Sequence, residues 1–427
     1  MTDHNLSRQS RLDLTEFRLG WRFLILGMFG VVTSMSAALL YGFGTMVIPL
    51  QEAFGWSRGE LQASITFLFA GVAVASQLLG WLYARFGLRR VAIVSVVLQV
   101  LCYAALTQLN GHIAWLYFAF FAMPLLCLGT IAITWTQLIS LWYERNRGLA
   151  LAIILSGTGV AALIVPPLLA WCMDRWGWQA GFLLLAVMPL VTTLPMALLW
   201  LQLPATEPQS TQGKARTAPL AATGFTFVEA RKSRIFWMCN LSLILSVSLI
   251  VAMVTVMVPY LQDKGVPALT ASQIFSAFGA SIIIGRLLVG YLLDHYSPIA
   301  ISAAALFTPA IGCLILLVTG PESTALLVLA TVCIGLSAGA EFDIAAFLMA
   351  RYFGMKDYAR IFGLHLGLVT IVAGMSPAFF GYIHTQYRNY DPVIMYSLVA
   401  AIVASLTLLT LRSASAFQSR PSQPEMA

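Results

Sequence analysis

The chain has 427 residues, of which 59% are hydrophobic and 10% are charged, and its formal net charge is +7. A soluble domain is about 45–50% apolar and about 25% charged, so this composition excludes a soluble globular protein. The mean hydropathy of +0.85 agrees. The apolar stretches are about 20 residues long and do not alternate strictly, which indicates membrane-spanning helices rather than barrel strands.

The first 21 residues have mixed charge and no apolar core, so we predict a cytoplasmic tail (1–21) without a cleavable signal. Twelve transmembrane helices are predicted after it, at residues 22–49, 59–82, 91–109, 113–141, 148–172, 180–203, 236–261, 272–293, 299–319, 324–350, 359–383 and 392–412. Residues 204–235 are rich in Pro, Thr, Ser and Gln and are predicted to form a cytoplasmic loop. It separates two six-helix bundles, 22–203 and 236–412, and a cytoplasmic tail follows at 413–427.

The basic residues collect on one side of these helices. On the other side, the predicted loops hold only Arg58, Arg175, Lys264 and Arg388. Cytoplasmic loops of membrane proteins carry an excess of Lys and Arg, so both termini are predicted to be cytoplasmic, in a cell inner membrane. The positive charge is therefore a topology signal, and no nucleic-acid partner is expected.

An internal repeat supports the division into two halves. Three residues recur 210 positions later, as Pro49 and Pro259, Gly55 and Gly265, and Gly80 and Gly290. A bundle repeated once in the same orientation is the plan of transporters whose two halves rock about a central site.

Local motifs resemble those of a known family. The turn GWLYARFGLRR from Gly80 is similar to the G-x-L-x-D-R-x-G-R-R loop of major facilitator transporters, although Ala84 stands where that family has Asp. The segments FGWSRGELQAS, RNRGLALAIILSGTG, IIIGRLLVGYLLD and GAEFDIAAFLMARYFG resemble the branch with the monocarboxylate transporters and the oxalate–formate antiporter. The resemblance covers almost the whole chain. It implies two pseudo-symmetric six-helix bundles, alternating access, and transport of small organic anions, commonly with a proton.

The same motif suggests gating residues. Because Ala84 replaces the acid in the first copy, the charge-relay role of the family is expected at Asp294, which keeps the acid in the second copy. Arg85 and Arg147 lie in cytoplasmic turns and are predicted to take part in gating with Asp294. The alternative is that these cations only set the topology.

Arg286 is the most informative charge, because ionisable groups inside a membrane are costly and usually functional. Its repeat counterpart is Ser76, so the charge does not belong to the shared scaffold. A guanidinium offers a planar fork of donors that matches a carboxylate, and the resemblance implies that an arginine of this helix engages the substrate. The alternative is a permanent ion pair with an acid of the helix at 324–350.

Two such acids, Glu341 and Asp343, are the predicted proton-coupling residues. Two residues apart on a helix means a rotation of about 200°, so we expect only one of them to face the central path. Desolvation favours the neutral acid and a nearby arginine favours the charged form. A fixed salt bridge is the alternative for each.

Four further residues are predicted to contact the substrate. They are His365, Tyr41, Thr134 and Gln137. Histidine can carry a proton or donate to an anion near neutral pH, and Tyr41 can donate its phenol proton to a carboxylate. The alternative for all four is packing between helices, since polar side chains commonly bond across membrane helices.

The sequence contains no phosphate-binding glycine loop, metal-ligand cluster or nucleophile–base arrangement, and its six cysteines lack metal or disulfide spacing. We therefore predict no enzyme, cofactor or metal. The expected function is proton-coupled uptake of a small organic carboxylate by a monomer in contact with membrane lipid. Efflux of apolar or cationic compounds and a membrane sensor without transport remain alternatives.

Overall fold

The computed structural model describes residues 14–143, 146–201, 224–354 and 356–413. The regular elements of these residues are all helical. The first half contains α1 (Leu14–Val32), α2 (Met35–Phe54), α3 (Arg58–Phe86), α4 (Leu88–Leu106), α5 (Ile113–Leu126), the 3-10 turn η1 (Leu128–Thr130), α6 (Ala132–Trp142), α7 (Arg147–Leu155), α8 (Gly157–Trp176), α9 (Trp178–Val191) and α10 (Thr193–Trp200).

The second half contains fewer and longer helices. They are α11 (Phe227–Lys232), α12 (Arg234–Asp263), α13 (Ala268–His295), α14 (Pro298–Val318), α15 (Thr324–Phe353), α16 (Tyr358–Tyr387), α17 (Asp391–Leu409) and the 3-10 turn η2 (Thr410–Ser413). Across the described residues, 11 helical segments are long and apolar enough to cross a membrane. The remaining predicted span, 113–141, is divided between α5 and α6. The all-helical membrane fold is thereby confirmed.

The outer surface of the bundle is apolar, as a lipid-facing surface must be. Val318, Leu199 and Leu101 are 76%, 71% and 58% exposed. In water such exposure of many large apolar side chains would be unfavourable, whereas in a bilayer lipid chains cover them.

Several predicted spans are interrupted. The first begins earlier than expected, at Leu14, and divides where the Ser34 hydroxyl accepts the Ala37 N–H and caps α2. The fourth divides at η1, shortly after Pro124, which has no N–H to donate to the helix. The fifth and sixth divide at Ser156 and Thr192. At each break a hydroxyl or a 3-10 turn forms hydrogen bonds with nearby backbone groups. The apolar character of the sequence continues across the breaks.

The segment predicted as a central loop also contains structure. Thr226 and Glu229 form a capping box that starts α11, and the Phe227 N–H donates to Asp357 at 2.8 Å. This short helix therefore packs on the start of α16. Most of the predicted loop, like most of both predicted tails, lies outside the described residues, and the domain boundaries stay predictions.

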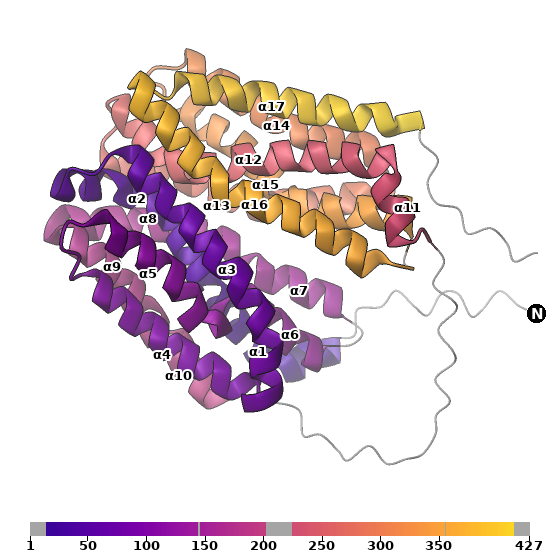
Figure 1. The fold of residues 1–427 in the computed structure, drawn as a ribbon, viewed down its shortest axis with the longest axis horizontal. Helices are drawn as coiled ribbons and strands as arrows, with labels where there is room; N and C mark the ends of the chain where they lie inside the picture. The colour runs from indigo at the N-terminus through magenta and orange to yellow at the C-terminus, as the bar shows by residue number, and fades with distance from the viewer. Residues whose placement is uncertain (1–13, 144–145, 202–223, 355, 414–427) are drawn as a thin grey trace, which may run out of the picture.

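The two halves lie side by side (Figure 1). We call the end of the bundle where α1 begins and α17 ends the terminal side, and the opposite end the far side. The halves meet through three helix pairs, α3 with α16, α8 with α13, and α2 with α12. Figure 1 shows the helices of the two halves close together at the far side and diverging toward the terminal side.

Glycines allow the closest approach between the halves. A Cβ at Gly279 of α13 would lie 2.3 Å from the Leu163 nitrogen and 2.4 Å from the Gly159 oxygen of α8. Small residues let membrane helices approach backbone to backbone. This contact fixes the distance between α8 and α13 beside the central cavity.

Candidate functional site

A cavity of about 340 Å³ lies between the two halves. The first half contributes Ser36, Ala37, Leu40, Tyr41, Leu68, Phe69, Val72, Ala132 and Thr158, and the second half contributes Val247, Ile250, Val251, Val254, Ile282, Arg286, Ala338, Glu341, Phe342, Val369, Thr370 and Ala373. Ligand sites are typically apolar pockets with a few convergent polar groups. Two charged side chains in an otherwise mainly apolar wall fit that description.

Arg286 reaches this cavity from α13 with unused donors. Its side chain is 14% exposed, and Nε lies 3.6 Å from Oδ2 of Asp343. That separation is too long for a hydrogen bond. Both Nε and Nη1 are buried without a hydrogen-bond partner among the described residues. A buried charged donor without a hydrogen-bond partner is costly, and these two nitrogens keep the capacity to donate to an acceptor.

The two acids of α15 take different positions. Glu341 is 5% exposed, lines the cavity, and has a buried Oε2 without a partner among the described residues. Asp343, with a side chain 43% exposed, is paired with Arg286 and is absent from the cavity wall. Arg286 therefore lines the cavity and also pairs with an acid of α15, and its role as a substrate contact stays a prediction.

Close backbone packing places Arg286 beside α15. A Cβ at Gly339 would lie 2.2 Å from the Ile282 oxygen and 2.9 Å from the Arg286 nitrogen, and one at Gly285 would lie 2.3 Å from the Leu336 oxygen. These two glycines bring α13 and α15 together directly beside Arg286. The fold therefore positions the cation and the acids through small residues rather than through loops.

Tyr41 faces the same cavity from α2 in the first half. Its ring centroid lies 6.3 Å from that of Phe278. Thr158 and Thr370 also line the wall and were missed by sequence reasoning. Both are single hydroxyls within long apolar runs, which read as packing residues until the tertiary arrangement places them.

The other three predicted substrate contacts lie elsewhere. His365 is 2% exposed, and its Nδ1 lies 2.9 Å from Oδ1 of Asn240 on α12. Thr134 is buried and hydrogen-bonds Tyr83 of α3, and Gln137 is exposed. None of the three is among the lining residues described above. Their role as substrate contacts stays a prediction. The contacts of His365 and Thr134 in the structure are hydrogen bonds between helices, as the packing alternative expects.

The predicted gating residues all lie toward the terminal side. Arg85 stacks its guanidinium 5.6 Å from the ring centroids of Trp81 and Phe86, on its own helix. Arg147 is exposed at the first residue of α7. Asp294 belongs to α13, but its side chain lies outside the described part of the structure. Their role in gating stays a prediction.

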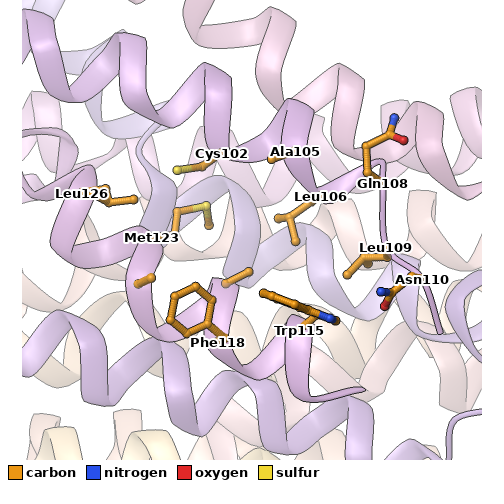
Figure 2. Close-up of a pocket in the computed structure, with 12 residues that line it drawn as sticks. Cys102, Ala105, Leu106, Gln108, Leu109, Asn110, Trp115, Phe118, Met123 and Leu126 are labelled. Atoms are coloured by element: carbon orange, nitrogen blue, oxygen red, sulfur yellow. The ribbon is translucent and has the colours of Figure 1, made fainter. Parts of the chain in front are cut away.

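A second hollow, of about 320 Å³, lies on the first half between α4 and α5. Figure 2 shows Gln108 and Asn110 at one end of it and a wall that includes Cys102 and Met123. None of its described lining residues is charged, and Trp115 is 55% exposed. This hollow opens to the lipid-facing surface of one half, so it does not share the character of the central cavity.

Comparisons with known proteins agree with this architecture. A family model described as Major Facilitator Superfamily matches residues 24–377. Monocarboxylate transporter 11 of Homo sapiens is 25% identical over 393 residues, which cover 88% of this chain and 80% of that protein. The gentisate transporter of Corynebacterium glutamicum is 23% identical over 412 residues, covering 92% and 86%. The crystal structure of the nucleoside transporter NupG is similar in fold, with a TM-score of 0.70, 13% identity, and coverage of 92% and 99%.

Proposed function

Since the chain belongs to the Major Facilitator Superfamily of secondary transporters rather than to an enzyme family, we propose that it carries a small organic carboxylate through its central cavity. One observation supports this choice above the others. Arg286 lines a cavity shared by both halves, and two of its buried donors have no hydrogen-bond partner in the part of the chain that the structure describes. A carboxylate supplies the two acceptor oxygens that a guanidinium fork accommodates.

The charges around Arg286 also favour a proton as the second solute. Arg286 carries one positive charge, and Glu341 and Asp343 carry two negative charges when both are ionised. The site is then net negative and repels an anion. A proton on Glu341 removes that repulsion, so proton binding and anion binding favour each other. Transport of the carboxylate together with a proton follows.

Alternating access requires that the cavity open to each side in turn. A ligand shifts such an equilibrium only when it binds the two states differently. We infer that the neutralised site, with anion and proton bound, favours the conformation in which the halves close around it. Because Tyr41 lies on the first half and Arg286 on the second, one carboxylate that contacts both would draw the halves together.

The orientation of the chain is part of the proposal. The basic residues of the terminal side outnumber those of the far side, so we assign the terminal side to the cytoplasm of a cell inner membrane. We propose that the direction of transport is uptake and that the transporter is a monomer. The relatives named above as monocarboxylate and gentisate transporters carry names of the same solute class.

Uptake into proteoliposomes tests the proposal. Labelled aliphatic monocarboxylates, dicarboxylates and aromatic acids are offered with and without an inward proton gradient. At least one carboxylate should accumulate, faster with the gradient, and Arg286→Gln should reduce its uptake at least about 100-fold, since truncating one member of a buried charged pair costs several kcal/mol. Arg175→Gln is the matched control, because Arg175 lies on α8 over Trp171 and away from the cavity.

Two results would contradict the proposal. Uptake of a cation or an apolar compound that survives Arg286→Gln would favour an efflux-type carrier. Carboxylate binding without accumulation under any gradient would favour a membrane sensor.

A further inference from the structure

A second charged cluster lies at the far side, where the sequence suggested only loop charges. Arg58, the first residue of α3, is 8% exposed and its guanidinium is surrounded. Nε donates to Gln51 at 3.2 Å, and Nη1 donates to Tyr390 at 3.2 Å. Nη1 and Nη2 both donate to the carboxylate of Asp263, and Nη2 lies 2.6 Å from Oδ1. Nε2 of His384 lies 3.4 Å from Nη1.

These partners come mainly from the other half of the molecule. Gln51 belongs to α2, whereas Asp263 ends α12, His384 lies on α16 and Tyr390 precedes α17. The bidentate ion pair between Arg58 and Asp263 therefore joins the two halves directly. Burial raises the pKa of Tyr390 to about 12, although the nearby Arg58 guanidinium opposes this, so the phenol is a neutral acceptor at pH 7.

The same face of α3 continues the connection toward the cavity. The Gly59 N–H donates to Thr385, Gln62 donates to the Thr255 carbonyl, and Thr66 donates to the Gly374 carbonyl, at 3.2, 3.0 and 2.7 Å. Among the described residues, the hydrogen bonds between the two halves come from Arg58 and these three positions of α3. The next turn, at Phe69, already lines the cavity.

The other charged and titratable groups of this region lie around the Arg58–Asp263 pair. Lys264 donates to the Leu316 and Thr319 carbonyls, so its ammonium is held at the end of α14. Arg388 and Asp391 line the same hollow as Arg58. His384 is 3.5 Å from Oδ2 of Asp263 and supports the pair from α16. Asp263 is consequently the acid that binds Arg58 in this cluster.

We propose that the Arg58–Asp263 pair is the latch that holds the far side closed during transport. Two halves that separate at the far side must break this pair, so it is present in one access state and absent in the other. A contact of this kind biases the equilibrium between the two states. The latch concerns access to the cavity and is independent of which solute the cavity binds.

Thiol labelling of the cavity tests the latch. The probe is a membrane-impermeant maleimide, applied to either side of proteoliposomes that carry Ala373→Cys, a cavity-lining position on α16. The chain without this added cysteine gives the background. Arg58→Gln and Asp263→Asn should each raise labelling from the far side about tenfold and lower it from the terminal side. Asp391→Asn, in the same hollow, is the matched control and should label like the parent protein.

The exchanged pair Arg58→Asp with Asp263→Arg should bring labelling back toward the parent values. Single variants that label like the parent on both sides would overturn the proposal. So would an exchanged pair that labels like the single variants, because the effect would then come from local packing rather than from the ion pair.

A covalent bridge provides a second measurement that does not remove the charges. A Cβ at Gly59 would lie 3.1 Å from Oγ1 of Thr385, so cysteines at both positions can be joined by oxidation. Labelling is read on the peptide that contains position 373, so that the reduced thiols at positions 59 and 385 do not contribute. The oxidised double variant should show no far-side labelling at position 373, and reduction should restore the parent value. Equal far-side labelling before and after oxidation would contradict an opening at this interface.

Discussion

Arg286 has two buried guanidinium nitrogens without a hydrogen-bond partner among the described residues, and in this it differs from Arg58. Arg58, for comparison, is satisfied by four side chains. The sequence identified Arg286 because a charge in the middle of an apolar run is rare and expensive. It did not separate Glu341 from Asp343, because the rotation of α15 about its axis is set by its packing on α13 and not by the spacing of the two acids.

The residue scale gives a prediction for Glu341. Glu341→Gln keeps the size of the side chain and removes its exchangeable proton. Exchange of labelled for unlabelled carboxylate should continue, whereas accumulation driven by a proton gradient should disappear. Both rates are measured in the same proteoliposomes.

Asp343→Asn is the comparison for that experiment. Because Asp343 pairs with Arg286 outside the cavity wall, the variant should still respond to the gradient, with altered affinity for the carboxylate. If Glu341→Gln responds to the proton gradient as the parent does, Glu341 is not the proton-coupling group.

At the scale of single helices, the sequence predicted existence and approximate bounds but not interruptions. Long apolar runs are a local signal, so their count could be read directly. The divisions near Ser34, Ser156 and Thr192 depend on small polar residues that also occur inside unbroken helices. His365 shows the same limit, because only the neighbouring Asn240 on α12 decides that the imidazole is held in helix packing.

Glycine positions on α13 give a prediction at this scale. Gly279→Ala places a methyl 2.3 Å from the α8 backbone, whereas a Cβ at Gly290 of the same helix meets nothing within 4 Å. We expect Gly279→Ala to reduce carboxylate uptake and the thermal unfolding temperature, and Gly290→Ala to leave both unchanged. Equal behaviour of the two variants would show that the α8–α13 contact does not limit transport.

The C-terminal end of α14 gives a second prediction at the scale of single helices. Lys264 and the Tyr260 hydroxyl donate to carbonyls at the C-terminus of α14, including that of Leu316. Lys264→Met leaves those carbonyls short of a charged donor and should destabilise the protein by about 2 kcal/mol. Thermal unfolding of the purified protein measures this, with Lys232→Met on exposed α11 as the control. An unchanged unfolding temperature would contradict the capping role.

At the scale of the whole molecule, the repeat and the motifs predicted the two-bundle plan and the relation to monocarboxylate transporters, both of which are confirmed. The cluster around Arg58 was not predicted, because three of its four partners are about 200 to 330 positions away in sequence and belong to the other half. Pairing between halves is the part of an alternating-access protein that a local pattern does not contain.

The central claim is that Arg286 binds a carboxylate in the cavity between the halves. Equilibrium binding of a transported, labelled carboxylate to the purified protein tests this most directly, with Arg286→Gln and Arg175→Gln measured beside the parent. The account predicts a dissociation constant at least about 100-fold weaker for Arg286→Gln and unchanged for Arg175→Gln. Equal affinity of the parent and Arg286→Gln would contradict it.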